Sequence, residues 1–180
     1  MGKVLNNINA VVRGIWKSVS MKIVSRQSSI GKRLRLFKDA VLSAYPHGRI
    51  IIGDDVRIDS NSTVVCVNNA CIAIGDKVGI GPSNRVISRN EISIGPNTIM
   101  GPNVMIYDHD HKFDLNHGVY RTEYNVASIS IGSNCWIGAG TIILKGTHIG
   151  NNCLIGAGCI IKGEIPANSK VIQKRDTMFL

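Results

Sequence analysis

The segment from Tyr107 to Asp114 concentrates the residue types that carry out proton chemistry. It reads Tyr-Asp-His-Asp-His-Lys-Phe-Asp and holds two of the chain's five histidines beside three aspartates. Histidine is the natural general base near neutral pH, and a neighbouring carboxylate can fix its tautomer and stabilise its protonated form. The same residue types also bind zinc or manganese, so composition alone leaves a metal site open.

A six-residue repeat surrounds this segment and must position it. Residues 131–166 divide into six blocks of six, and an isoleucine opens every block. A small residue usually follows the isoleucine, and a small or β-branched residue stands at the fifth position. Neither a helix nor a strand has a period of six. A fixed self-similar period is typical of a solenoid.

Three blocks of six would close one triangular coil, so that residues eighteen apart stack. We expect Ile131 to lie on Ile149 and Ile137 on Ile155, each pointing inward at a corner. The glycine that follows would let the chain turn where a Cβ costs energy. The fifth residue must be small because the interior is narrow; these residues are Cys135, Thr141, Thr147, Cys153 and Cys159.

This pattern resembles that of the hexapeptide-repeat acyltransferases. The resemblance implies an all-β fold, a left-handed parallel β-helix of triangular coils with one protruding catalytic loop. The left hand comes from the resemblance, since the general rule for parallel crossovers favours the right. Earlier blocks open at Ile52, Ile74 and Ile94, and we expect the slips in register at 67–70 and 89–91 to be small corner bulges.

Composition and charge divide the chain. We expect a basic helical segment and connector at 1–49, the β-helix at 50–170 with its loop at 107–128, and a tail at 171–180. Residues 1–49 hold ten of the 21 Lys and Arg but one of the 12 acids. Aromatic content of 5% suits a narrow aliphatic interior. Five cysteines without a CxxC pair indicate reduced thiols and a cytoplasmic setting.

Residues 4–19 have the apolar periodicity of a helix. The residues expected on its apolar face are Val4, Leu5, Ile8, Val11, Val12, Ile15, Trp16 and Val19. Two interpretations stay open: a helix docked on the β-helix or on another subunit, and a basic amphipathic helix on an anionic membrane surface. No run of about 18 apolar residues occurs, so no transmembrane helix is expected. No nucleic-acid-binding motif is found.

The chain is similar to the maltose, galactoside and nodulation-factor acetyltransferases in its histidine segment. Those enzymes carry a His-Pro-x-Asp pattern, and His111-Lys-Phe-Asp114 is similar, with Lys112 in place of the proline. The resemblance implies that His111 is the catalytic base, with His109 as the alternative. Asp114, Asp108 or Asp110 would orient the imidazole.

The resemblance also implies residues for acetyl-CoA. The family's Val-Trp-Ile-Gly motif is similar to Cys135-Trp136-Ile137-Gly138, with Ala139 beside the pantetheine, and its Gly-Ala-Gly-Ser segment is similar to the one containing Ala157. Lys162 is displaced by one position from the family's lysine. Lys174 and Arg175 would meet the CoA phosphates or form a solvated tail, and Trp136 is alternatively an exposed coil-edge aromatic.

The acceptor is less well specified. Asn84 lies near the position of an acceptor-binding asparagine in sugar acetyltransferases, but a corner-turn asparagine fits equally well. Arg121, Glu123 and Tyr124 close the loop and would touch the acceptor.

We therefore expect an acetyl-CoA-dependent O-acetyltransferase that acts on a sugar hydroxyl in surface-polysaccharide biosynthesis. It would be a homotrimer that needs no metal, placed in the cytoplasm or at the inner face of the membrane through its N-terminal segment. The alternatives are N-acylation of an amino sugar nucleotide, a γ-type carbonic anhydrase and a non-catalytic scaffold on the same fold. The γ-type enzyme needs three zinc histidines from separate coils and adjacent subunits, whereas His109, His111 and His117 share one loop.

Overall fold

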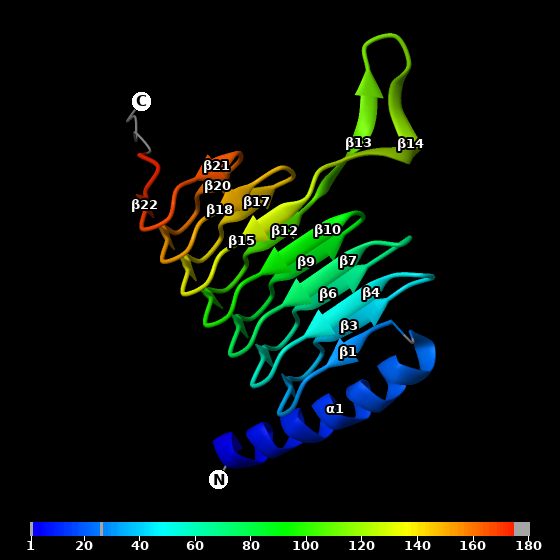
Figure 1. Ribbon diagram of the computed structural model, residues 1–180, viewed down its shortest axis with the longest axis vertical. Coiled ribbons are helices and arrows are strands. Elements are labelled where there is room, and N and C mark those ends of the chain that lie inside the picture. Colours follow the sequence, from blue (N-terminus) through cyan, green and yellow to red (C-terminus); the bar gives the residue numbers. More distant parts are fainter. Residues whose placement is uncertain (1, 26, 175–180) are drawn as a thin grey trace, which may run out of the picture.

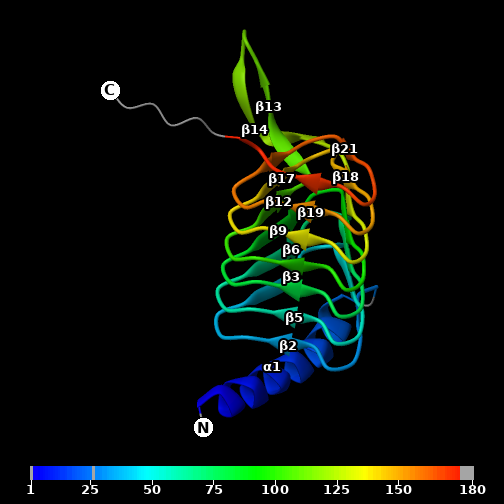
Figure 2. The same ribbon diagram turned by 90° about the vertical axis from the view of Figure 1, so that its left-hand side faces the viewer.

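The computed structural model describes residues 2–25 and 27–174. The chain forms a three-sided prism of stacked coils, with one helix across its first coil and a hairpin projecting near its other end (Figures 1 and 2). The helix is α1 (Gly2–Val24) and the hairpin is β13 (His109–Asp114) and β14 (Gly118–Val126).

Each face of the prism is one parallel sheet. The first sheet is β1 (Ser29–Ile30), β4 (Arg49–Ile52), β7 (Cys71–Ile74), β10 (Glu91–Ile94), β15 (Ile129–Ile131), β18 (His148–Ile149) and β21 (Glu164–Ile165). The second sheet is β2 (Arg35–Leu36), β5 (Arg57–Ile58), β8 (Gly79–Ile80), β11 (Ile99–Met100), β16 (Trp136–Ile137), β19 (Leu154–Ile155) and β22 (Lys170–Val171). The third sheet is β3 (Val41–Ala44), β6 (Thr63–Cys66), β9 (Arg85–Ser88), β12 (Met105–Tyr107), β17 (Ile142–Leu144) and β20 (Ile160–Ile161).

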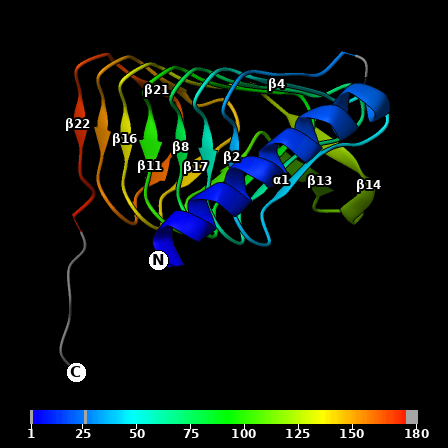
Figure 3. The ribbon, with the colours of Figure 1, turned by 90° about the horizontal axis from the view of Figure 1, so that it is seen from below.

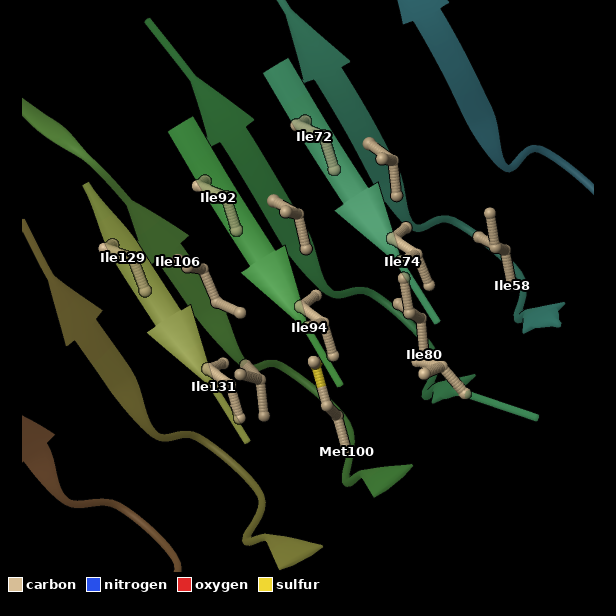
Figure 4. Packing of buried hydrophobic residues seen from close by; sticks show 14 of the residues in the cluster. Ile58, Ile72, Ile74, Ile80, Ile92, Ile94, Met100, Ile106, Ile129 and Ile131 are labelled. Carbon is tan, nitrogen blue, oxygen red and sulfur yellow. The ribbon is translucent and has the colours of Figure 1, made fainter. Parts of the chain in front are cut away.

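Isoleucines stack in columns inside the prism (Figure 4). Ile131 pairs with Ile149 and Ile137 with Ile155, so the predicted eighteen-residue register is confirmed. All four side chains are buried. The coils nearer the N-terminus are longer. Ile50 pairs with Ile72, so one coil there takes 22 residues. The predicted slip at 67–70 is a corner turn between β6 and β7.

Small side chains occupy the fifth position in five of the six blocks, as expected, and the sixth block has the partly buried Ile165 there. The five predicted small residues there are all buried: Cys135, Thr141, Thr147, Cys153 and Cys159. The glycine after each isoleucine needs a different explanation from the one expected. A Cβ on Gly138 would lie 2.5 Å from the backbone nitrogen of Ala157, so glycine is required there because the next coil is close. The left-handed turn itself falls two residues later, at Gly140 (φ 67°).

The β-helix begins at Ser29, before the expected start at residue 50. The segment expected as a basic connector contains β1, β2 and β3. The repeat is hard to see there because Leu34, Leu36 and Leu42 are the buried residues where the next coil has valine or isoleucine. The corner positions are also atypical, since Arg33 (φ 59°) takes a left-handed conformation that glycine or asparagine usually supplies.

Helix α1 is confirmed, but it docks through a face other than the apolar one. It lies against β1, β2 and β3 of the first coil. Its buried residues are Ala10, Gly14 and Met21, and a Cβ on Gly14 would lie 2.0 Å from the carbonyl oxygen of Leu34. Within the described residues, no helix combines the length and hydrophobicity needed to cross a bilayer.

Candidate active site

The histidine segment forms a protruding antiparallel hairpin. The chain leaves the third sheet after β12, runs out along β13, returns along β14 and enters the first sheet at β15 (Figure 1). His111 pairs across the hairpin with Tyr124, and His109 pairs with Val126. The loop expected at 107–128 is therefore a regular two-stranded arm attached at one corner of the prism.

A buried carboxylate anchors the base of this arm. Asp108 is fully buried and accepts hydrogen bonds from the Ser88 hydroxyl (2.6 Å), the Arg89 N–H (2.8 Å) and the Asn90 N–H (2.9 Å). Burial alone would raise the pKa of Asp108, but hydrogen bonds from His109, Ser88 and the two amides outweigh it and lower the pKa. Asp108 is therefore an ionised anchor that joins the arm to the corner after β9.

His109 is the partner of this carboxylate. Its Nδ1 lies 3.0 Å from Asp108 Oδ1, and 14% of its side chain is exposed. Its ring lies edge-on to Tyr107 and Tyr124, with centroids 6.1 and 5.6 Å apart. The imidazole is held from several sides, so His109 has the environment of a structural residue at the foot of the arm.

His111 is two residue pairs further out along the arm and is exposed. Its Nδ1 lies 3.3 Å from the carbonyl oxygen of Tyr120, and its ring lies 4.5 Å from that of Tyr124. A carbonyl is an acceptor only, so this contact favours a proton on Nδ1 and leaves Nε2 as the acceptor. Arg89 lies over the same Tyr124 ring, 3.7 Å from its centroid, which braces the ring beneath His111.

Asp114 does not orient either imidazole. It accepts hydrogen bonds from the Tyr120 hydroxyl (2.6 Å) and from the N–H groups of Asn116 and His117. These bonds lower the pKa of the carboxyl, the Tyr120 hydroxyl having the largest effect. Asp114 thus closes the turn of the arm, because its side chain satisfies the N–H groups of the turn residues. Of the three candidate aspartates, Asp108 is the one that meets a histidine.

The residues expected to touch the acceptor lie on β14. Glu123 pairs with Lys112 across the arm at 2.7 Å, and Arg121 and Glu123 are exposed. Lys145, just after β17, pairs with Asp110 at 3.2 Å and ties the arm to the following coil. Sequence reasoning did not find Lys145, since only the fold brings it beside β13.

Asn84 does not belong to this surface. It is fully buried, and its Oδ1 accepts a hydrogen bond from the Val104 N–H at 2.8 Å. The assignment of Asn84 to the acceptor is therefore corrected: it is an interior residue of the coil, one step past the corner residue Ser83 (φ 59°).

The candidate cofactor residues lie on and around the second sheet. Trp136 is 54% exposed and stands in an outward column with Ile99 before it and Leu154 and Lys170 after it. Lys170 was not predicted, because it falls where the repeat changes length. The column offers an apolar strip with a cation at one end, and this chemistry suits a pantetheine chain and a phosphate.

The smaller candidate residues lie at the corners beside the second sheet, and the candidate lysines lie on separate parts of the surface. Gly138 packs directly against Ala157 of the next coil, and Gly101 packs in the same way against Ala139. Lys162 and Lys174 are exposed. Arg175 lies outside the described residues.

One chain does not bring the arm and the cofactor surface together. The arm leaves the prism at the corner between the third and first sheets, whereas Trp136 is on the second sheet. His111 and Trp136 are thus presented to different sides of the molecule. As for metals, the described part of the chain contains no group of three or more His, Cys, Asp or Glu side chains placed to hold an ion.

Comparison with known proteins identifies the repeat. Residues 128–163 match the family model described as bacterial transferase hexapeptide, six repeats. This segment is a bacterial transferase hexapeptide repeat. The chain is 26% identical over 174 residues to a probable acetyltransferase of Mycobacterium tuberculosis, a match that covers 89% of this chain and 56% of that protein. It spans about half the length of the first curated relatives that it matches.

Two solved structures share the coils of this hexapeptide-repeat chain at 19% identity. One is a variant of AntD, an N-acyltransferase from Bacillus cereus, in complex with dTDP-4-amino-4,6-dideoxyglucose and coenzyme A (TM-score 0.69, 87% and 85% of the two chains). The other is the polysialic acid O-acetyltransferase OatWY (TM-score 0.64, 85% and 80%). The predicted left-handed parallel β-helix and the resemblance to hexapeptide-repeat acyltransferases are confirmed.

Proposed function

We propose that this chain is an acetyl-CoA-dependent O-acetyltransferase that acts on a sugar hydroxyl, with His111 as the general base. The observation that carries the proposal is the exposed imidazole on a braced arm, with Nδ1 directed at the Tyr120 carbonyl and Nε2 left as an acceptor. A general base must reach the proton that it removes, and His111 is more accessible than His109. The probable acetyltransferase among the relatives supports the acyl-transfer class.

In the proposed reaction His111 acts first as a general base and then as a general acid. His111 Nε2 takes the proton of the acceptor hydroxyl as its oxygen attacks the thioester carbonyl carbon. The carbon–sulfur bond then breaks, and the imidazolium returns the proton to the departing sulfur. Acetyl-CoA, when bound, supplies the acetyl group as a thioester. Backbone N–H groups beside the second sheet would stabilise the oxyanion.

Asp108 and His109 act as positioning residues in this proposal. Their buried pair fixes the foot of the arm, and Tyr124 with Arg89 fixes the ring beneath His111. Acetyl-CoA would lie along the Trp136 column, with Lys170 and Lys174 near its phosphates. Since the arm and the column face different sides of one chain, the complete site would use the arm of one copy and the second sheet of its neighbour, as in a homotrimer.

The acceptor class rests on the two kinds of structural neighbour. OatWY is an O-acetyltransferase on polysialic acid, which favours a saccharide hydroxyl in surface-polysaccharide synthesis. AntD is an N-acyltransferase bound to an amino sugar nucleotide, which keeps N-acylation as the second candidate. A histidine base suits the hydroxyl better, because a hydroxyl must lose its proton to attack whereas a neutral amine is already a nucleophile.

The test is CoA release from acetyl-CoA with matched panels of neutral sugars and amino sugars. We expect turnover with hydroxyl acceptors and a loss of about 10²–10⁴-fold in His111→Ala. His117→Ala is the matched control, since His117 is also an exposed histidine of the arm and stacks on Tyr120. Faster turnover with amines would replace O- by N-acylation. Full activity in His111→Ala would exclude His111 as the base.

A further inference from the structure

Helix α1 presents its apolar face away from the protein. We use the name outer stripe for its seven exposed apolar residues, which are Val4 (64% exposed), Leu5 (60%), Ile8 (54%), Val12 (46%), Ile15 (60%), Trp16 (74%) and Val19 (53%). Soluble proteins seldom leave a contiguous apolar patch of this kind uncovered, and such patches usually mark an interaction site.

The stripe lies opposite the docked face of the helix. Each residue advances by about 100° around a helix, which puts Ile8 and Val19 on the far side from Ala10 and Met21. The helix crosses the end of the prism, as the view from that end shows (Figure 3). The stripe therefore points away from the coils, along the long axis of the molecule. Helix α1 therefore contacts its own β-helix through the face that holds Ala10, Gly14 and Met21, and its apolar face stays exposed.

The surroundings of the stripe are basic. Residues 1–38 contain nine Lys or Arg and no Asp or Glu. A groove of about 340 Å³ runs between α1 and the first coil. Ile15 and Val19 of the stripe line one wall of it, and Lys32 and Arg33 line the other. Apolar and cationic groups thus face each other across this groove, where Arg33 also pairs with Asp55.

We propose that α1 is an interfacial anchor that binds the surface of an anionic lipid bilayer. An apolar stripe flanked by cations is the arrangement by which a helix lies in the plane of a membrane, with its apolar side chains among the acyl chains and its cations near anionic headgroups. A second copy of this chain is a poorer occupant. Two such ends packed face to face would bring the basic segments of both chains together, and residues 1–38 of each chain hold nine Lys or Arg and no acidic residue.

This inference depends on α1 and not on the hairpin, so it stands apart from the proposed reaction. The first experiment is co-sedimentation of the full chain with vesicles of phosphatidylcholine alone and of phosphatidylcholine with phosphatidylglycerol. The test variant is Ile8→Glu/Ile15→Glu. The matched control is Ile160→Glu/Ile172→Glu, which makes the same charge change at two exposed isoleucines (51% and 65%) far along the β-helix.

We expect binding to anionic vesicles that weakens on adding salt and falls about tenfold or more in the test variant, while the control variant binds like the wild type. Binding equal in the test variant and the wild type would overturn the proposal. Absence of vesicle binding, with a wild-type assembly that falls apart in the test variant, would overturn it in favour of a second copy on the stripe.

A fluorescence measurement locates the contact. The chain has two tryptophans, so Trp136→Phe leaves Trp16 as the one reporter. Trp16 is 74% exposed, and its emission should shift to shorter wavelength on adding anionic vesicles and be quenched by brominated lipid. An unchanged spectrum at a vesicle concentration that sediments the protein would show that the stripe is not the binding surface.

Discussion

At the scale of single residues, Asp108 is the side chain on which the arm depends most. The groups that contact its carboxylate are all donors: a hydroxyl, two amides and an imidazole nitrogen. Asp108→Asn keeps the shape but turns one acceptor into a donor that faces other donors. We expect a loss of about 2–4 kcal/mol in the free energy of unfolding, measured in urea. Asp110→Asn, at an exposed ion pair with Lys145, should cost under about 1 kcal/mol.

The effect of Asp108→Asn on the free energy of unfolding should depend on pH in a predictable direction. The pKa of Asp108 is lower in the folded protein than in the unfolded chain. Its contribution is therefore present above the unfolded pKa of about 4 and is lost as the pH falls through the folded value. The gap in unfolding free energy between wild type and Asp108→Asn should be largest near neutral pH and narrow below about pH 4. A gap that widens on acidification would contradict this assignment.

The cysteines give a second test at this scale. Cys66, Cys135, Cys153 and Cys159 are buried, and burial raises the pKa of Cys66 to about 11. Cys71 is half-buried on β7. We expect a thiol reagent to modify one thiol per native chain quickly and all five after unfolding, with the fast phase absent in Cys71→Ser. Rapid reaction of several thiols in the native protein would be inconsistent with the interior described.

The sequence was most informative where the repeat is strict. The stacking of Ile131 on Ile149 follows from spacing alone, because a six-residue period fixes which side chain faces inward. The first coil could not be predicted from the repeat because leucines fill much of its interior. The link between Asp108 and the corner after β9 joins residues some twenty apart in the chain, and no local pattern contains it. The outward direction of the stripe on α1 also needed coordinates, since periodicity finds an apolar face but does not say what covers it.

At the scale of elements, α1 is joined to the first coil by close backbone contact. Gly14→Ala places a Cβ about where the Leu34 carbonyl oxygen lies, at 2.0 Å. Alanine favours a helix by about 1 kcal/mol over glycine, but the clash should outweigh this and destabilise the protein by about 1–3 kcal/mol. Asn9→Ala, at an exposed position of the same helix, is the control and should be neutral or mildly stabilising. Thermal unfolding followed by circular dichroism compares the two; equal stability would mean that α1 sits further from the coil.

At the scale of the whole molecule, the separation of the arm from the Trp136 column predicts complementation between copies. Co-expressed His111→Ala and Trp136→Ala chains should form mixed assemblies in which some sites combine an intact arm with an intact column. For random mixing in a ring we expect recovery of roughly a quarter of wild-type activity. The control is the double variant His111→Ala/Trp136→Ala mixed with either single variant, which should recover no activity because every site lacks an intact arm or an intact column. No recovery in the mixed assemblies would place the site within one chain.

The position of α1 also determines how far the arm would lie from a membrane bound at α1. The arm leaves the prism after the fourth coil, three strand spacings of about 4.8 Å above the first, and a helix adds about 10 Å. The foot of the arm would thus lie roughly 25 Å from a plane beneath α1. If α1 rests on a bilayer as proposed, a sugar joined directly to a lipid would stay below that level, whereas the distal units of a longer glycan would reach it. We therefore expect the proposed enzyme to favour extended glycans over short ones.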